Sequence, residues 1–146
     1  MSAEARDFDP RPPTRCVRLH KVLVIDRDAF WGPAIRQALE EAGYYLNLVA
    51  DAREGCRRAL ERAYDLVIVS ASLGRGALLG IVESLSHRIN PPCILILAGA
   101  EEARMVKDQP GVPCLSILRM PCAIEEVVDA ARALVGVPWS DHHKGA

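Results

Sequence analysis

This sequence of 146 residues has no excess of charge of either sign and no long hydrophobic run. Its apolar runs stay well below the roughly 18 to 20 residues of a membrane-spanning helix, and its N-terminus lacks the basic start and apolar core of a signal peptide. The net charge is −1, with Lys and Arg dispersed along the chain, so no basic patch for a nucleic-acid backbone is visible. We therefore expect a cytoplasmic protein that binds neither membranes nor nucleic acids.

The sequence also lacks any paired or metal-binding arrangement of cysteines. The chain contains no C-x-x-C motif and no histidine at a metal-ligand spacing from a cysteine. We expect the cysteines to be reduced and to act as small hydrophobic residues of a cytosolic protein. The five cysteines are Cys16, Cys56, Cys93, Cys114 and Cys122.

Half of the residues are hydrophobic, and the length suits one well-filled core. Between residues 20 and 136, short β-branched runs alternate with segments of helical periodicity. This alternation is typical of a parallel sheet covered on both faces. The strands are predicted at 21–25, 45–49, 66–69, 93–97 and 114–118. We predict a doubly wound α/β fold over residues 20–136, with tails at 1–19 and 137–146.

Polar residues mark several ends of these elements. Asp28 precedes the first helix and is expected to cap it, with a metal ligand or a phosphoacceptor as the alternative role. Asp51 and Glu54 form a D-x-x-E pattern that predicts a capping box. Ser70 follows the third strand, at the rim where open α/β sheets bind ligands. Its hydroxyl is therefore a candidate nucleophile or a small polar cap.

Five blocks of the sequence, in order, resemble the receiver (CheY-like) domain of two-component response regulators. The blocks are KVLVIDRDAF, AIRQALEEAGY, ADAREGCRRALERAYDLVIVS, PPCILILAGAEE and ILRMPCAIEEVVDAARALV. The resemblance covers residues 20–136. It implies a flavodoxin-like, three-layer αβα sandwich with strand order 2-1-3-4-5 and a working site at the carboxyl rim of the sheet.

The resemblance also implies a phosphorylation pocket, and this chain departs from it at most positions. In receivers, two acids hold Mg²⁺, an aspartate accepts the phosphoryl group, and a hydroxyl and a lysine complete the pocket. Asp26 matches the first acid, whereas Arg27 replaces the second. Ser70 stands at the phosphoacceptor position, Leu97 at the hydroxyl and Met120 at the lysine. A guanidinium offers only donors, and no group remains to neutralise a phosphoryl group. We predict that Mg²⁺ binding is lost and that the domain is a pseudo-receiver.

Three residues are candidates for binding a partner. Phe30 and Trp31 open the first helix, on the face where receivers dock their kinases or phosphotransferases, and one of the two is expected to belong to the core. Ile117 replaces the aromatic residue that reports the receiver switch. The resemblance implies a partner such as a histidine kinase, a phosphotransferase or another regulator, or a homodimer. The outer face of the last helix is charged, which is usual for a surface helix.

Other readings of the pocket remain open. We expect Arg27 to pair with Asp26 in place of a metal, and the alternative is that its side chain points to solvent. Ser70 could be the nucleophile of a small flavodoxin-like enzyme, although the G-x-S-x-G elbow is missing and no histidine follows a strand. A phosphorylatable receiver with a rearranged pocket is a third alternative. We predict a stand-alone domain without enzymatic activity that acts through protein–protein contact.

Overall fold

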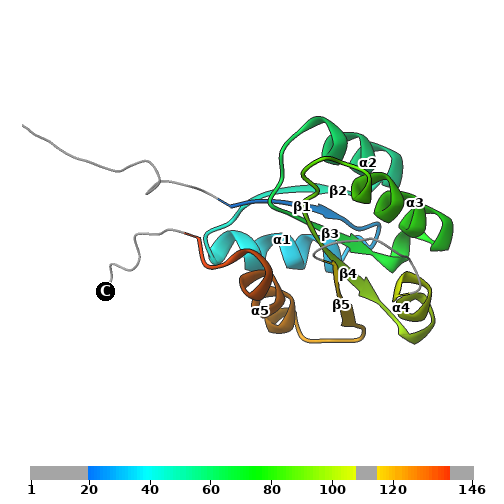
Figure 1. Ribbon diagram of the computed structural model, residues 1–146. Coiled ribbons are helices and arrows are strands. Elements are labelled where there is room, and N and C mark those ends of the chain that lie inside the picture. Colours follow the sequence, from blue (N-terminus) through cyan, green and yellow to red (C-terminus); the bar gives the residue numbers. More distant parts are fainter. Residues whose placement is uncertain (1–19, 108–114, 139–146) are drawn as a thin grey trace, which may run out of the picture.

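Figure 1 shows the computed structural model, which describes residues 20–107 and 115–138. Its parallel strands form one sheet in the order β2-β1-β3-β4-β5, which confirms the predicted fold. The strands are β1 (Lys21–Ile25), β2 (Tyr45–Val49), β3 (Leu66–Ser70), β4 (Cys93–Ala98) and β5 (Leu115–Arg119). The helices of the described residues are α1 (Trp31–Glu41), α2 (Ala52–Glu61), α3 (Arg75–Ser86), α4 (Ala100–Lys107) and α5 (Ile124–Val135), and a 3₁₀ turn, η2, spans Ala71–Leu73.

The core consists of two hydrophobic clusters, one on each face of the sheet. Because side chains alternate along a strand, Leu23 and Ile25 of β1 pack on the face covered by α2 and α3. Val22 and Val24 of the same strand pack on the face covered by α1 and α5. Figure 1 shows α1 and α5 side by side on their face of the sheet. The central strands are thus buried on both faces, as their continuous apolar sequences predict.

The start of α2 confirms only half of the predicted capping box. Asp51 is the N-cap, and its side chain accepts a hydrogen bond from the backbone N–H of Glu54 at 2.8 Å. The side chain of Glu54 does not return to the cap. Its Oε2 instead binds the guanidinium groups of Arg57 and Arg58, because these cations lie three and four residues further along the same helix face.

Among the cysteines that the structure describes, Cys93 departs from the expectation, and Cys16 and Cys114 lie outside the described residues. Cys56 and Cys122 are free thiols, whereas Cys93 is disulfide-bonded, so the expectation that all the cysteines are reduced is wrong for Cys93. Burial raises the pKa of the Cys122 thiol, and the nearby Glu126 carboxylate adds to that shift. The thiolate of Cys122 is therefore disfavoured.

Two further expectations concern the ends of the chain and membranes. The predicted tails lie outside the described residues, apart from residues 137 and 138. Within the described part of the chain, no helix combines the length and the apolar character that crossing a bilayer requires.

Candidate functional site

The candidate site lies where β1 and β3 end at the carboxyl edge of the sheet. These strands are neighbours, with Ile25 in register with Val69, so the residues that follow them meet at one rim. Asp26 follows β1 and is 2% exposed, while Ser70 ends β3 and is 6% exposed. They are the two buried polar residues among the described part of the chain. The parallel pairing of the strands thus explains why two residues far apart in the sequence share a site.

Ser70 caps the short 3₁₀ turn that follows its own strand. Its Oγ accepts a hydrogen bond from the backbone N–H of Ser72 at 3.1 Å and lies 3.0 Å from the hydroxyl oxygen of Ser72. The serine hydroxyl is thereby used in local structure, as is common for serine at the start of a turn. The structure therefore places Ser70 as a small polar cap.

Ser72 connects the two buried residues. Its hydroxyl donates to Oδ1 of Asp26 at 2.8 Å and accepts a hydrogen bond from the backbone N–H of Arg27 at 3.2 Å. Together with the contact to Ser70, this gives a continuous chain of hydrogen bonds from Ser70 through Ser72 to Asp26. We call these three residues the serine–aspartate network.

The remaining oxygens of this network do not make a site for Mg²⁺. Oδ1 of Asp26 accepts from the backbone N–H of Asp28 as well as from Ser72, and Oδ2 is buried without a hydrogen-bond partner among the described residues. Magnesium requires near-octahedral coordination by oxygen ligands. No cluster of three or more acidic, histidine or cysteine side chains suited to a metal occurs in the described part of the chain. Asp26 is thus the one carboxylate of the network, and the position that follows it holds the cation of Arg27, which offers only donors, so this donor set does not fit the metal that the resemblance implies.

The side chain of Asp28 serves the start of α1. Its Oδ1 accepts hydrogen bonds from the backbone N–H groups of Phe30 and Trp31 at 2.8 and 2.9 Å, which confirms the predicted cap. The bonds from Trp31 and, next, from Phe30 lower the pKa of the Asp28 carboxyl group. The ionised form of Asp28 is favoured because these donors stabilise it.

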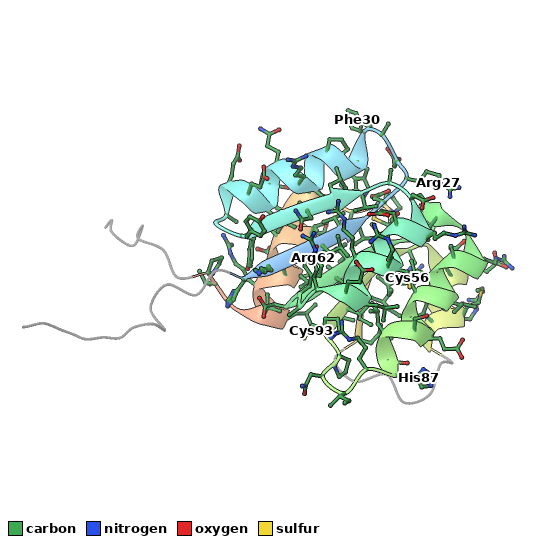
Figure 2. The ribbon with its side chains drawn as sticks, turned by 90° about the horizontal axis from the view of Figure 1, so that it is seen from above. Arg27, Phe30, Cys56, Arg62, His87 and Cys93 are labelled. Atoms are coloured by element: carbon green, nitrogen blue, oxygen red, sulfur yellow. The ribbon has the colours of Figure 1, made fainter. Side chains whose placement is uncertain are left out.

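The other pocket positions bring no charge to the network. Arg27 is exposed and lies at the outline of the molecule in Figure 2. No ion pair joins its guanidinium to Asp26 within the described residues, so the predicted pair is wrong and the solvent-facing alternative holds. Leu97 is in register with Ser70 on β4 and 1% exposed. Met120 packs against the hydrophobic cluster beneath α1 and α5.

The candidate partner-binding residues have different surroundings. Phe30 is 82% exposed and projects at the edge of the molecule (Figure 2). Trp31 is half-buried and packs against the cluster beneath α1 and α5, which confirms that one of the two aromatics belongs to the core. Ile117 packs on the opposite cluster. Of the three, Phe30 is the side chain that is free to meet a partner.

Ser72 is a member of the site that was not predicted from the sequence. Its signal was weak, because S-A-S-L-G after a buried strand carries neither periodicity nor a known motif. The S-x-S spacing could have indicated a serine turn, since a serine hydroxyl often accepts from the N–H two residues later. The contact with Asp26 depends on the pairing of β1 with β3 and is not a local property.

Comparisons with known proteins give one curated relative and many structures of the same fold. No protein-family model matches the chain. It is 37% identical over 100 residues, or 67% of its length, to the regulatory protein VirG of Agrobacterium fabrum. The chain spans only 38% of the length of that relative.

Solved structures of response regulators share the fold at low sequence identity. The chemotaxis response regulator CheY4 of Vibrio cholerae superimposes with a TM-score of 0.70 and 19% identity, covering 80% of this chain and 99% of the other. A streptococcal protein, described as one of a family of redox sensors evolved from two-component response regulators, gives a TM-score of 0.69 and 22% identity over 80% of this chain and 51% of its own. A response regulator of Thermotoga maritima gives a TM-score of 0.67 and 14% identity over 81% and 98%. The resemblance to CheY-like receiver domains is therefore confirmed at the level of the fold.

Proposed function

We propose that this receiver-like chain is a pseudo-receiver of two-component or phosphorelay signalling, which acts through protein–protein contact without phosphorylation of an aspartate. The fold and the similarity to VirG support the signalling role. The observation that supports the absence of phosphorylation is the serine–aspartate network, in which the hydroxyl of Ser72 donates to Asp26, the acid that a receiver would give to a metal, and the hydroxyl of Ser70 bonds to Ser72.

The energetics of phosphoryl transfer support this proposal. Catalysis of that reaction consists of positioning and of neutralising the negative charge on the phosphoryl oxygens. At this rim, Ser70 replaces the acceptor carboxylate, and the positions of the hydroxyl and lysine hold Leu97 and Met120. A phosphoryl group brought to Ser70 would meet the buried carboxyl group of Asp26 without a compensating cation.

The same contacts disfavour a serine hydrolase. A serine nucleophile needs a general base within hydrogen-bond reach, and the partners of the Ser70 hydroxyl are the backbone N–H and the hydroxyl of Ser72. The hydroxyl of Ser72 in turn donates to Asp26, so no histidine takes part in this chain of contacts. We therefore propose that the protein is not an enzyme.

A titration with Mg²⁺ and beryllofluoride, a phosphoryl mimic, tests the proposal. We expect the backbone amide NMR signals of residues 26–28 and 70–72 to stay unchanged at millimolar metal. Saturable shifts confined to these amides would favour the alternative of a phosphorylatable receiver with a rearranged pocket. The matched control is the quadruple variant Arg27→Asp, Ser70→Asp, Leu97→Thr, Met120→Lys, in which the receiver groups are restored and a response is expected.

A second experiment addresses the partner. Phe30→Ala removes the exposed ring next to the network, and Tyr45→Ala is a matched control because Tyr45 is a second exposed aromatic residue, 51% exposed, on the edge strand β2. We expect the first change alone to lower the amount of a signalling protein, such as a histidine kinase or phosphotransferase, that is captured from the native cell extract. Equal capture by both variants would contradict a contact through Phe30.

A further inference from the structure

A groove between α1 and α5 lies apart from the serine–aspartate network. It has a volume of about 390 Å³, and α1 and α5 lie side by side along it (Figure 1). Four aliphatic residues and four charged residues line the groove: Ala38, Glu41, Ala42, Ile124, Glu125, Val128, Asp129 and Arg132. Because Phe30 precedes the first residue of α1 and the groove begins at Ala38, the groove lies roughly 12 Å or more along the helix from the backbone of Phe30.

The aliphatic part of the groove suits a narrow apolar side of another helix. Ala38 and Ala42 have small side chains that leave room for close approach, and Ile124 and Val128 are only partly buried. Ile124 and Val128 pack against the core cluster on one side and line the groove on the other. The groove therefore retains apolar surface that no described element covers.

Several charged side chains at or near the groove already have partners within the chain. Glu126 also lies in the first turn of α5, but its Oε2 accepts from the backbone N–H of Ala123 and it does not line the groove. Asp129 pairs with Arg132 at 3.6 Å. Glu41 accepts a hydrogen bond from the neutral amide of Gln37.

Two rim carboxylates have no cationic side chain paired with them among the described residues. Glu41 and Glu125 make no ion pair with any residue of the described chain, and they flank the aliphatic floor from different helices. An acidic rim around an apolar floor is complementary to a helix with apolar side chains flanked by Lys or Arg.

We propose that this groove binds a basic amphipathic helix of a partner protein. The helix places small aliphatic side chains over Ala38 and Val128 and a cation beside Glu41 and Glu125. The lining residues of α5 extend over about two helical turns, so the contact needs only a short helical segment. This site is separate from the contact through Phe30, and either one can fail without the other.

A pair of synthetic helical peptides tests the proposal. Each carries Ala and Leu on one side, with Lys along both edges in the first peptide and Glu in the second. We expect the lysine peptide alone to shift the NMR signals of the Ala38, Ala42 and Val128 amides, with an affinity that falls as NaCl is raised. Equal shifts by both peptides, or shifts centred on other residues, would overturn the proposal.

Charge variants locate the interaction. Glu41→Lys and Glu125→Lys should each weaken binding of the lysine peptide roughly fivefold, whereas Glu83→Lys, an exposed glutamate of α3, should leave binding unchanged. Glu125→Gln removes the charge but keeps the size of the side chain. It replaces Glu125→Lys in the experiment if reversal of the charge disturbs the first turn of α5. Equal weakening by Glu83→Lys would overturn the site. Self-association that Glu41→Lys abolishes would instead show that a second copy of the chain occupies the groove.

Discussion

At the scale of single residues, the number of hydrogen bonds distinguishes the two serines of the rim. The hydroxyl of Ser70 makes its hydrogen bonds with Ser72 alone, through the backbone N–H and the hydroxyl of that residue. Ser72 contacts Ser70, Asp26 and the backbone of Arg27. A buried carboxyl group that loses a donor loses the compensation for its desolvation. The hydroxyl of Ser72 therefore matters more for stability than the residue that replaces the phosphoacceptor.

Replacing Ser72 with alanine tests the contribution of its hydroxyl to stability. Ser72→Ala leaves Oδ1 of Asp26 with the single donor from Asp28, and we expect the free energy of unfolding to fall by about 1–3 kcal/mol. The control is Ser86→Ala, which removes a hydroxyl bonded to the carbonyl of Glu83 on the surface of α3 and should change stability by less than about 0.5 kcal/mol. Urea denaturation measures both, and equal losses would contradict a structural role of the network.

The cap of α1 gives a pH-dependent contribution to stability. The pKa of Asp28 is lowered in the folded protein by its bonds with the N–H groups of Trp31 and Phe30. A carboxyl group with a lowered pKa stabilises the fold at pH values above its pKa in the unfolded chain, which is about 3.9. This stabilisation is lost as the pH falls through the pKa of the group in the folded protein. Asp28→Asn keeps an acceptor but does not titrate. The stability difference between the wild type and Asp28→Asn should therefore shrink on acidification from pH of about 6 to about 3.

A second non-titrating variant controls for this cap. Asp28→Ser also accepts from the first-turn N–H groups and should follow Asp28→Asn across the pH range. Denaturant unfolding at each pH provides the comparison. A stability difference that is the same at both ends of the range would show that the carboxyl group does not supply the pH dependence.

At the scale of helices and strands, α2 packs closely against β1 at Gly55. A Cβ atom added at Gly55 would lie 2.7 Å from side-chain atoms of Ile25, and Ile25 is fully buried. We expect Gly55→Ala to lower the free energy of unfolding by about 1–3 kcal/mol through overpacking. The measurement is urea denaturation.

Gly80 provides a matched control on the neighbouring helix. It lies within α3, and an added Cβ would have no neighbour within 4 Å. Gly80→Ala should therefore raise stability by about 0.5–1 kcal/mol, since alanine loses less backbone entropy in a helix. If both changes altered the free energy of unfolding equally, α2 would be able to move away from β1 without loss of stability, and the overpacking explanation would be wrong.

Regular elements could be predicted closely, because they depend on local patterns. The predicted bounds of the strands at 21–25 and 45–49 match β1 and β2. The third and fourth strands are each one residue longer than predicted, and β5 extends one residue beyond the predicted end, to Arg119, while residue 114 lies outside the described part of the chain. These ends are set by pairing with neighbouring strands, such as Ser70 with Leu97.

The site could be predicted less well than the fold. The end of the third predicted strand placed Ser70 at the rim, and the resemblance to receivers placed Asp26 in the same pocket. The sequence could not reveal Ser72, which reaches Asp26 from a turn of three residues. It also wrongly favoured an ion pair for Arg27, because two residues adjacent in the sequence can point in different directions when a strand ends.

At the scale of the whole molecule, the rim is the product of several strands, and one substitution cannot rebuild it. Ser70→Asp would restore the acceptor carboxylate that receivers use. It would also place a second carboxyl group beside Asp26 while Leu97 and Met120 still provide no hydroxyl or cation. Two neighbouring buried carboxyl groups disfavour each other's ionised form, and only an ionised carboxylate attacks a phosphoryl donor.

We therefore expect no phosphorylation of the Ser70→Asp variant by a small phosphodonor such as acetyl phosphate. Intact-mass measurement after incubation with Mg²⁺ provides the readout, and the comparison is the quadruple variant Arg27→Asp, Ser70→Asp, Leu97→Thr, Met120→Lys. A phosphorylated product of Ser70→Asp alone would show that the missing cation is not what prevents the reaction. Modification of the quadruple variant alone is the outcome expected if charge balance at this rim decides the chemistry, because only that variant supplies both a metal site and a lysine.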